Sequence, residues 1–283
     1  MTDGEYEIKV RIPEKMQIKS VLRELKKIPE EYDLPKTSNL LDDLLNDDRI
    51  KAMHKAANIM VVDYIKYNDH GRYHAIISTR NALKVYLYTY EDVKPNMVSS
   101  VSATLDEALF VVSIATFLHD VGNIIHRDYH YFSSFYLSEK IIWEYINRYF
   151  GNYDLERRWI LFSHIANAIV SHDDAIFAYT LEASSVKVGE GCDMAAGRSR
   201  RPYSIGKVDI HSVSALSITE VDILKGNDKP LLIRVNMSNP AGIFQIEEIL
   251  LSKLNMSILK DYTKLEVMVD NKPIKLSILR EMK

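Results

Sequence analysis

The sequence has almost no cysteine and no long apolar segment. Its 283 residues include a single cysteine, Cys192, so no disulfide can form within the chain, which favours a reducing compartment. The first residues, MTDGEYEIKV, carry acidic side chains and lack the apolar run of a signal peptide. No stretch approaches the roughly 20 uninterrupted apolar residues of a transmembrane helix. These absences predict a cytoplasmic protein that does not enter a membrane.

An excess of positive charge is also missing. The formal net charge is −3, which argues against a general affinity for nucleic acid and leaves room for a local basic pocket. With 47% hydrophobic and 27% charged residues, the composition is typical of a soluble globular protein. A chain of this length can contain a catalytic core and one smaller domain.

The apolar residues follow a helical period through most of the first two thirds of the chain. The segment 107–118 is apolar on nearly every face, as expected of a helix inside a bundle. The run 184–203, rich in glycine, serine and arginine, departs from the pattern. Helices are expected over 15–27, 40–66, 107–118, 133–150 and 155–171, with a further helix beginning near Arg72.

After about residue 206 the period shifts towards that of strands. Strands are expected at 216–224, 231–237 and 265–269, with a helix over 243–254, and a short strand is expected near the N-terminus at 6–12. The pattern predicts a mainly α fold, a helical bundle with a small C-terminal α+β domain. The expected divisions are an N-terminal strand and helical extension (1–50), a helical catalytic domain (51–205) and a β-β-α-β domain (206–283).

Seven of the nine histidines fall between positions 70 and 172. His70 and His74 are four residues apart, as are His126 and His130, so each pair would share one face of a helix. The adjacent pair His119-Asp120 ends the most apolar predicted helix, where both side chains would be expensive to bury without a partner such as a metal ion. Imidazole and carboxylate together suit Zn, Fe, Mn or Co.

Each histidine taken alone is more often a structural residue than a ligand. We expect His54 on the polar side of the 40–66 helix, His164 in a structural role and His211 capping a strand. Cys192 lacks a neighbouring base, so we expect it to pack and not to act as a nucleophile. The ordered series of histidines and acids carries more information than any single member.

This series resembles the HD superfamily of metal-dependent phosphohydrolases. The stretches that carry the resemblance are GRYHAIISTRNAL, ATFLHDVGN, HRDYHYFSSFYL, AIVSHDD and VKVGEGCDMAAGRSRRPY. The likeness is greatest to an archaeal-type group that has NDHG before the first histidine and a small trailing α/β domain, and it spans roughly residues 60–255. It implies the helical HD fold and hydrolysis of a phosphate ester.

By this resemblance His74, His119 and Asp120 are the first metal ligands. The superfamily places an aspartate in a late helix as the fourth ligand; here Glu190 falls at that position, and Asp193 is the alternative. Members with two ions add further histidines, and His130 and His172 match those positions. We therefore expect a two-ion site in which Asp120 bridges, with a one-ion site of His74, His119, Asp120 and Glu190 as the alternative.

The expected cofactor is one or two divalent transition-metal ions, Mn, Fe, Co, Ni or Zn, with Mg as a further alternative. Asp120 would orient a metal-activated water, and His70 or His126 would protonate the leaving alkoxide. Arginine suits the non-bridging phosphoryl oxygens. The candidate substrate-binding residues are Arg127, Arg198, Arg200 and Arg201.

The resemblance makes a phosphomonoester or phosphodiester, by default a nucleotide, the expected substrate. The alternative is a non-catalytic nucleotide sensor or scaffold that retains the HD fold, a role that the glutamate at position 190 would suit. A homodimer built through the C-terminal strands is also left open by the pattern.

Overall fold

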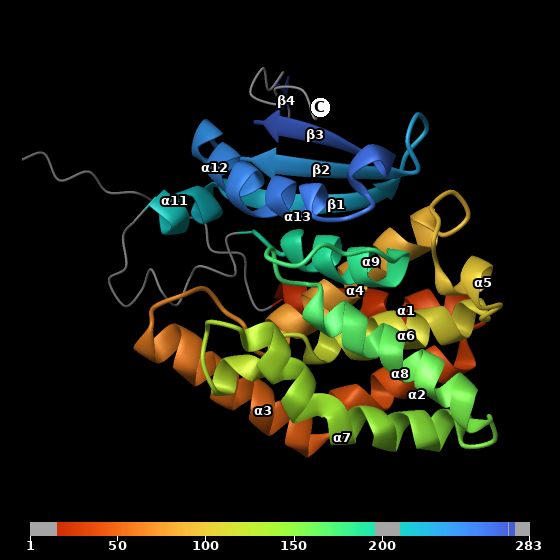
Figure 1. Ribbon diagram of the computed structural model, residues 1–283. Helices are drawn as coiled ribbons and strands as arrows, with labels where there is room; N and C mark the ends of the chain where they lie inside the picture. The colour runs from red at the N-terminus through yellow and green to blue at the C-terminus, as the bar shows by residue number, and fades with distance from the viewer. Residues whose placement is uncertain (1–15, 196–209, 271, 275–283) are drawn as a thin grey trace, which may run out of the picture.

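The computed structural model describes residues 16–195, 210–270 and 272–274, which form a helical body with a small sheet at one end (Figure 1). The longer described helices are α1 (Met16–Glu31), α2 (Pro35–Asn46), α3 (Asp48–Asn58), α4 (Arg72–Thr89), α6 (Leu105–Leu118), α7 (His130–Phe150), α8 (Leu155–Val170), α9 (Leu181–Gly191) and α11 (Ile210–Ser217). The short helical segments are η1 (Ile59–Tyr64), α5 (Met97–Ser100), η2 (Val121–Ile124), η4 (Pro240–Gly242), α12 (Ile243–Gln245), η5 (Ile246–Leu251), α13 (Ser252–Asn255) and η6 (Lys260–Tyr262).

The sheet has the strand order β1-β2-β3-β4, with β1 (Ile218–Lys225), β2 (Leu231–Met237), β3 (Thr263–Val269) and β4 (Lys272–Pro273). β2 pairs antiparallel with β1 and parallel with β3, because the helical segment 243–255 connects β2 to β3. The mainly α fold with a small C-terminal α+β domain is therefore confirmed. The expected strand at 6–12 lies outside the described residues.

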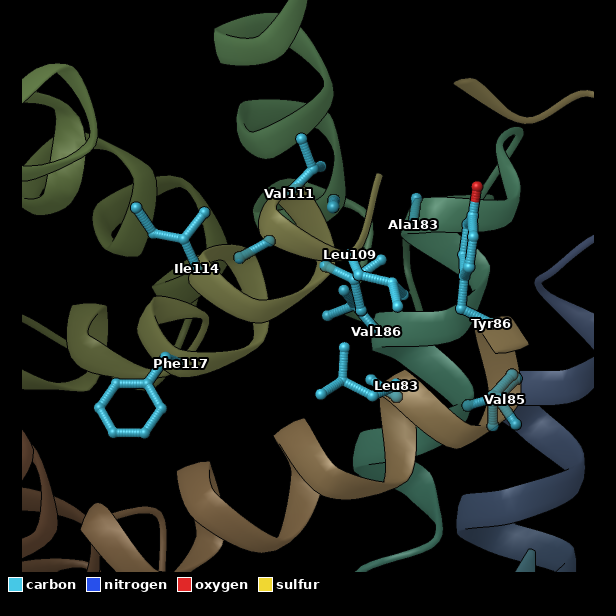
Figure 2. Packing of buried hydrophobic residues seen from close by; sticks show 14 of the residues in the cluster. Leu83, Val85, Tyr86, Leu109, Val111, Ile114, Phe117, Ala183 and Val186 are labelled. Atoms are coloured by element: carbon cyan, nitrogen blue, oxygen red, sulfur yellow. The ribbon is translucent and has the colours of Figure 1, made fainter. Parts of the chain in front are cut away.

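Helix α6 lies at the centre of the bundle. Thr104 and Glu107 form a reciprocal capping box at its start, and every residue from Glu107 to Leu118 is buried. The stretch Leu105–Ile124 is long and apolar enough to cross a membrane, but 94% of its most apolar part is buried inside the protein, as in the core helix of a soluble protein. Leu109 of α6 lies close to Leu83 of α4 and Val186 of α9 (Figure 2).

Two expectations about the helices were wrong. The segment 40–66 is not one helix, because the Asp47 side chain accepts the amide hydrogens of Arg49 and Ile50 and thereby starts α3 anew. The run beginning at residue 184 continues the helix α9 as far as Gly191. Its glycine at position 189 serves packing, since a Cβ there would lie 2.5 Å from the backbone nitrogen of Ala82 in α4.

Candidate metal centre

Five helical segments bring buried histidines and acids together. His74 lies in the first turn of α4, His119 and Asp120 follow α6, His130 begins α7, His172 follows α8, and Glu190 lies in the last turn of α9. All six side chains are buried. These six residues are far apart in the sequence and come together because the helices that carry them pack against the apolar helix α6.

The first group consists of His74, His119 and Asp120. The Nε2 atoms of the two histidines lie 3.2 Å apart. Oδ2 of Asp120 lies 3.4 Å from Nε2 of His74 and 3.3 Å from Nε2 of His119. Oε1 of Glu190 is 3.9 Å from Nε2 of His74, on the edge of this group.

The second group consists of Asp120, His130 and His172. The Nε2 atoms of these two histidines lie 3.0 Å apart. The other carboxylate oxygen of Asp120, Oδ1, lies 3.3 Å from Nε2 of His130 and 3.9 Å from Nε2 of His172. Asp120 therefore presents one oxygen to each histidine pair.

Hydrogen bonds at Nδ1 fix the tautomer of each ring. A carbonyl or carboxylate oxygen can only accept, so the Nδ1 atom that contacts it carries the proton, and in a neutral ring Nε2 then carries a lone pair. Oδ2 of Asp193 accepts from Nδ1 of His74 at 2.7 Å. The carbonyl oxygens that accept from the other rings are those of Thr116 for His119 at 2.6 Å, Arg127 for His130 at 3.0 Å and Ile169 for His172 at 2.6 Å.

Each pair of facing Nε2 atoms fits a shared cation. Two imidazole lone pairs at 3.0 to 3.2 Å repel each other unless a proton or a cation lies between them. Within the described residues, Oδ2 of Asp120 is buried and accepts no hydrogen bond. The two groups of buried histidine and aspartate side chains could each hold a metal ion, since their candidate ligand atoms lie within 4.8 Å of one another.

The protonation states also suit cation binding. Burial raises the pKa of Asp120, but the neighbouring His119 and His70 outweigh it and hold that pKa well below the usual range. Burial, together with the proximity of His119 and His130, lowers the pKa of His172 well below that of a free imidazole. An anionic Asp120 and a neutral His172 are the forms that bind a metal ion.

The loop after Asp120 holds its carboxylate in place. The Asn123 side chain donates to the Asp120 carbonyl oxygen at 2.9 Å and to Oδ1 at 3.0 Å. Gly122 allows this loop to approach α7, because a Cβ at this position would lie 2.0 Å from the carbonyl oxygen of His130. Asn123 has a role that the sequence analysis missed, although it belongs to the quoted stretch ATFLHDVGN.

The predicted acid and base residues lie at different depths. His70 is buried beside the first group, with its ring centroid 5.7 Å from that of His74, and its Nδ1 donates to the Asn68 carbonyl oxygen. The His126 side chain is 68% exposed, and its Nδ1 accepts from the Asp128 amide. The structure therefore places His70 beside the histidine cluster and His126 at the surface.

Of the predicted phosphate-binding arginines, Arg127 lies within the described residues. Nη1 of Arg127 donates to Nε2 of His130 at 3.3 Å and lies 3.9 Å from Oδ1 of Asp120, and its side chain is partly exposed. The guanidinium thus covers the second group from the solvent side. Arg198, Arg200 and Arg201 lie outside the described residues.

The two late acids have separate contacts. Asp193 binds Nδ1 of His74, the ring nitrogen opposite the one that faces the first group. Glu190 directs Oε1 towards His74, while Oε2 forms an ion pair with Lys253. Lys253 lies in the C-terminal domain and was missed by the sequence analysis.

His54 corrects an expectation about the remaining histidines. It is buried and not on a polar helix face, and its Nε2 contacts the carbonyl oxygen of Phe117 at 2.8 Å. Burial lowers its pKa to about 4. His164 is partly buried, with Nδ1 3.8 Å from Oε2 of Glu182. Cys192 is buried, and burial raises the pKa of its thiol to about 12, as expected of a packing residue.

Comparison with known proteins identifies an archaeal relative. The chain is 37% identical over 237 residues to the uncharacterized protein MJ1020 of Methanocaldococcus jannaschii, a match that covers 83% of this chain and 90% of that protein. No protein-family model matches the chain. No solved structure matches it either. The arrangement of histidines and aspartate is compatible with an HD domain.

Proposed function

We propose that this chain, which belongs to one family with the uncharacterized M. jannaschii protein, is a metal-dependent hydrolase of phosphate esters. One observation carries the proposal: the Asp120 carboxylate presents one oxygen to each of two histidine pairs whose Nε2 atoms face each other. This arrangement supports a centre in which two cations share an aspartate. A centre with a single cation in the first group is the simpler alternative.

The chemistry of such a centre suits hydrolysis. A bound divalent cation supplies an acidified water and a Lewis acid for phosphoryl oxygens. The chain itself holds Asp120 anionic and directs its two oxygens by means of Asn123. Arg127 lies at the solvent side of the second group, where its guanidinium can bind a non-bridging phosphoryl oxygen in place of His130. The substrate that this supports is a phosphorylated small molecule, and the HD resemblance favours a nucleotide.

The leaving group would take its proton from a residue near the first group. His70 is the better candidate, because it is buried next to His74, whereas His126 is exposed. An acid within the site can transfer a proton to an alkoxide that an exposed side chain would reach only by moving. His126 stays a candidate for contacts with the distal part of a substrate.

The test compares the parent protein with Asp120→Ala. The metal content of both proteins is measured after reconstitution with Mn²⁺, and turnover is measured with p-nitrophenyl phosphate, bis-p-nitrophenyl phosphate and a panel of nucleotides. We expect the parent to bind Mn²⁺ and cleave at least one ester, and Asp120→Ala to lose the metal and about a thousandfold or more of the rate. Asp128→Ala, which changes an exposed aspartate nearby, is the matched control and should behave like the parent.

The possible results separate the functions. Turnover that survives Asp120→Ala would show that the proposed site is wrong. Metal binding without cleavage of any ester would favour a non-catalytic nucleotide sensor or scaffold. A parent protein that binds no divalent metal would contradict the metal-dependent hydrolase, and it would equally contradict a sensor that uses a bound metal.

A further inference from the structure

Lys253 reaches the candidate metal centre from the C-terminal part of the chain. It lies in α13, which runs beside α9 between the sheet and the helical body (Figure 1). The side chain is buried. Gly191 provides its space, since a Cβ at that position would lie 2.8 Å from Cδ of Lys253. Alanine or any larger residue at position 191 would therefore displace the lysine.

The ammonium group of Lys253 lies next to three oxygen atoms. Its Nζ forms an ion pair with Oε2 of Glu190, lies 3.3 Å from Oδ1 of Asp174 and donates to the carbonyl oxygen of His172 at 3.0 Å. The hydroxyl of Ser252 donates to the other oxygen of Asp174 and so orients that carboxylate. The Lys253 ammonium thus contacts the side chain of one candidate ligand, Glu190, and the backbone of another, His172.

These contacts place a fixed positive charge next to the site of a proposed cation. The carboxylates of Glu190 and Asp174 both lie beside Nζ of Lys253, and two such neighbours favour the charged form of a lysine. A buried lysine would repel a nearby divalent ion strongly in a medium of reduced dielectric constant. A lysine at this position therefore opposes tight binding of the metal ion, so its role must be a different one.

We propose that Lys253 is a positioning residue that occupies one oxygen of Glu190 and offsets its charge, so that Glu190 offers only Oε1 to the first group. The proposal rests on the cation-binding part of the proposed function. The ligand acids Asp120 and Glu190 then carry one uncompensated negative charge between them, which leaves the loaded centre more positive towards an anionic substrate. This role of Lys253 also accounts for a glutamate at position 190 in place of the expected aspartate, because the longer side chain spans from Lys253 to the first group.

The test is a calorimetric titration of Mn²⁺ into the metal-free full chain. Lys253→Met frees the second oxygen and the full charge of Glu190, so we expect it to bind the first Mn²⁺ about tenfold more tightly than the parent. Lys253→Arg retains the charge and should bind Mn²⁺ like the parent. Lys264→Met, which removes an exposed lysine paired with Asp228 in the same domain, is the matched control and should leave the affinity unchanged.

The direction of the change separates this role from a structural one. Loss of packing weakens metal binding, whereas loss of a repelling charge tightens it, so an affinity equal to or below that of the parent would overturn the proposal. If Lys253→Met does not fold, the comparison is made between Glu190→Gln and Glu190→Gln/Lys253→Met, where the double variant should bind Mn²⁺ more tightly. A parent that binds no Mn²⁺ would instead overturn the proposed function.

Discussion

The two histidine pairs share Asp120 but differ in the charges around them. Beside the first pair lie two further acids: Asp193 binds Nδ1 of His74, and Glu190 points one oxygen towards the same ring. Both rings of the second pair are anchored by backbone carbonyl oxygens. One acid, Asp173, lies 3.9 Å from Nδ1 of His130, and the Arg127 guanidinium donates to Nε2 of the same ring.

Under the proposed function, this difference would give the two groups different tasks. A cation in the first group meets more negative charge, since Lys253 offsets only one of the surrounding acids. A cation in the second group shares its surroundings with a guanidinium and lies nearer to the solvent-facing side chain of Arg127. The first group is therefore expected to hold its ion more tightly, and the second to meet the anionic substrate.

Removing one histidine from each pair should produce the largest contrast. His119→Ala is expected to abolish the tighter Mn²⁺ site, and His172→Ala the weaker one, so each variant retains a single ion bound with the affinity of the other site. Titration of Mn²⁺ with calorimetry measures both affinities. Retention of the tighter site in His119→Ala, or its loss in His172→Ala, would reverse the comparison.

Removing Arg127 should have a smaller and different effect. Arg127→Ala is expected to raise KM for a phosphate ester about tenfold, because a charged hydrogen bond to the substrate is lost. Its affinity for Mn²⁺ in the second group should not fall, since a repelling charge has been removed. Steady-state kinetics and a Mn²⁺ titration measure the two effects, and Arg148→Ala, at an exposed arginine near the other end of α7, is the matched control. An unchanged KM would place the substrate elsewhere.

His54 is a buried histidine outside the two candidate groups. Its pKa is about 4 in the folded protein and about 6.5 when unfolded, so the unfolded chain binds more protons between these values. The free energy of unfolding of the metal-free protein should therefore fall as the pH drops through this window, with a contribution from His54 of about 3 kcal/mol at most. Urea titrations at pH 7 and pH 4.5 in the presence of a chelator measure this loss. In His54→Gln the loss should be smaller, and an equal loss would contradict the assignment.

Local signals in the sequence were sufficient for much of the fold. The apolar run from Glu107 and its capping box specify α6, and the strand β2 follows the expected bounds because its buried residues alternate. The expected ligands His74, His119, Asp120, His130 and His172 do converge in the structure. That expectation came from the resemblance to the HD superfamily, since periodicity alone could not bring distant helices together.

The remaining features depend on contacts between segments distant in the sequence. Glycine at position 189 lowers helix propensity locally, and only the close approach of α9 to α4 explains it. The sequence placed His54 on the polar face of its own helix, but the C-terminal end of α6 covers it. Lys253 had a signal, because it lies on the same helical stripe as the buried Ile246 and Leu250, where a charged residue requires a buried partner.

The central claim is that one carboxylate, Asp120, joins two cation sites. Electron paramagnetic resonance of the protein titrated with Mn²⁺ tests it most directly, because two ions bridged by a carboxylate are magnetically coupled. We predict that the spectrum of an isolated Mn²⁺ grows with the first equivalent and is replaced by that of a coupled pair with the second. A second equivalent that only enlarges the spectrum of isolated ions would contradict the bridge.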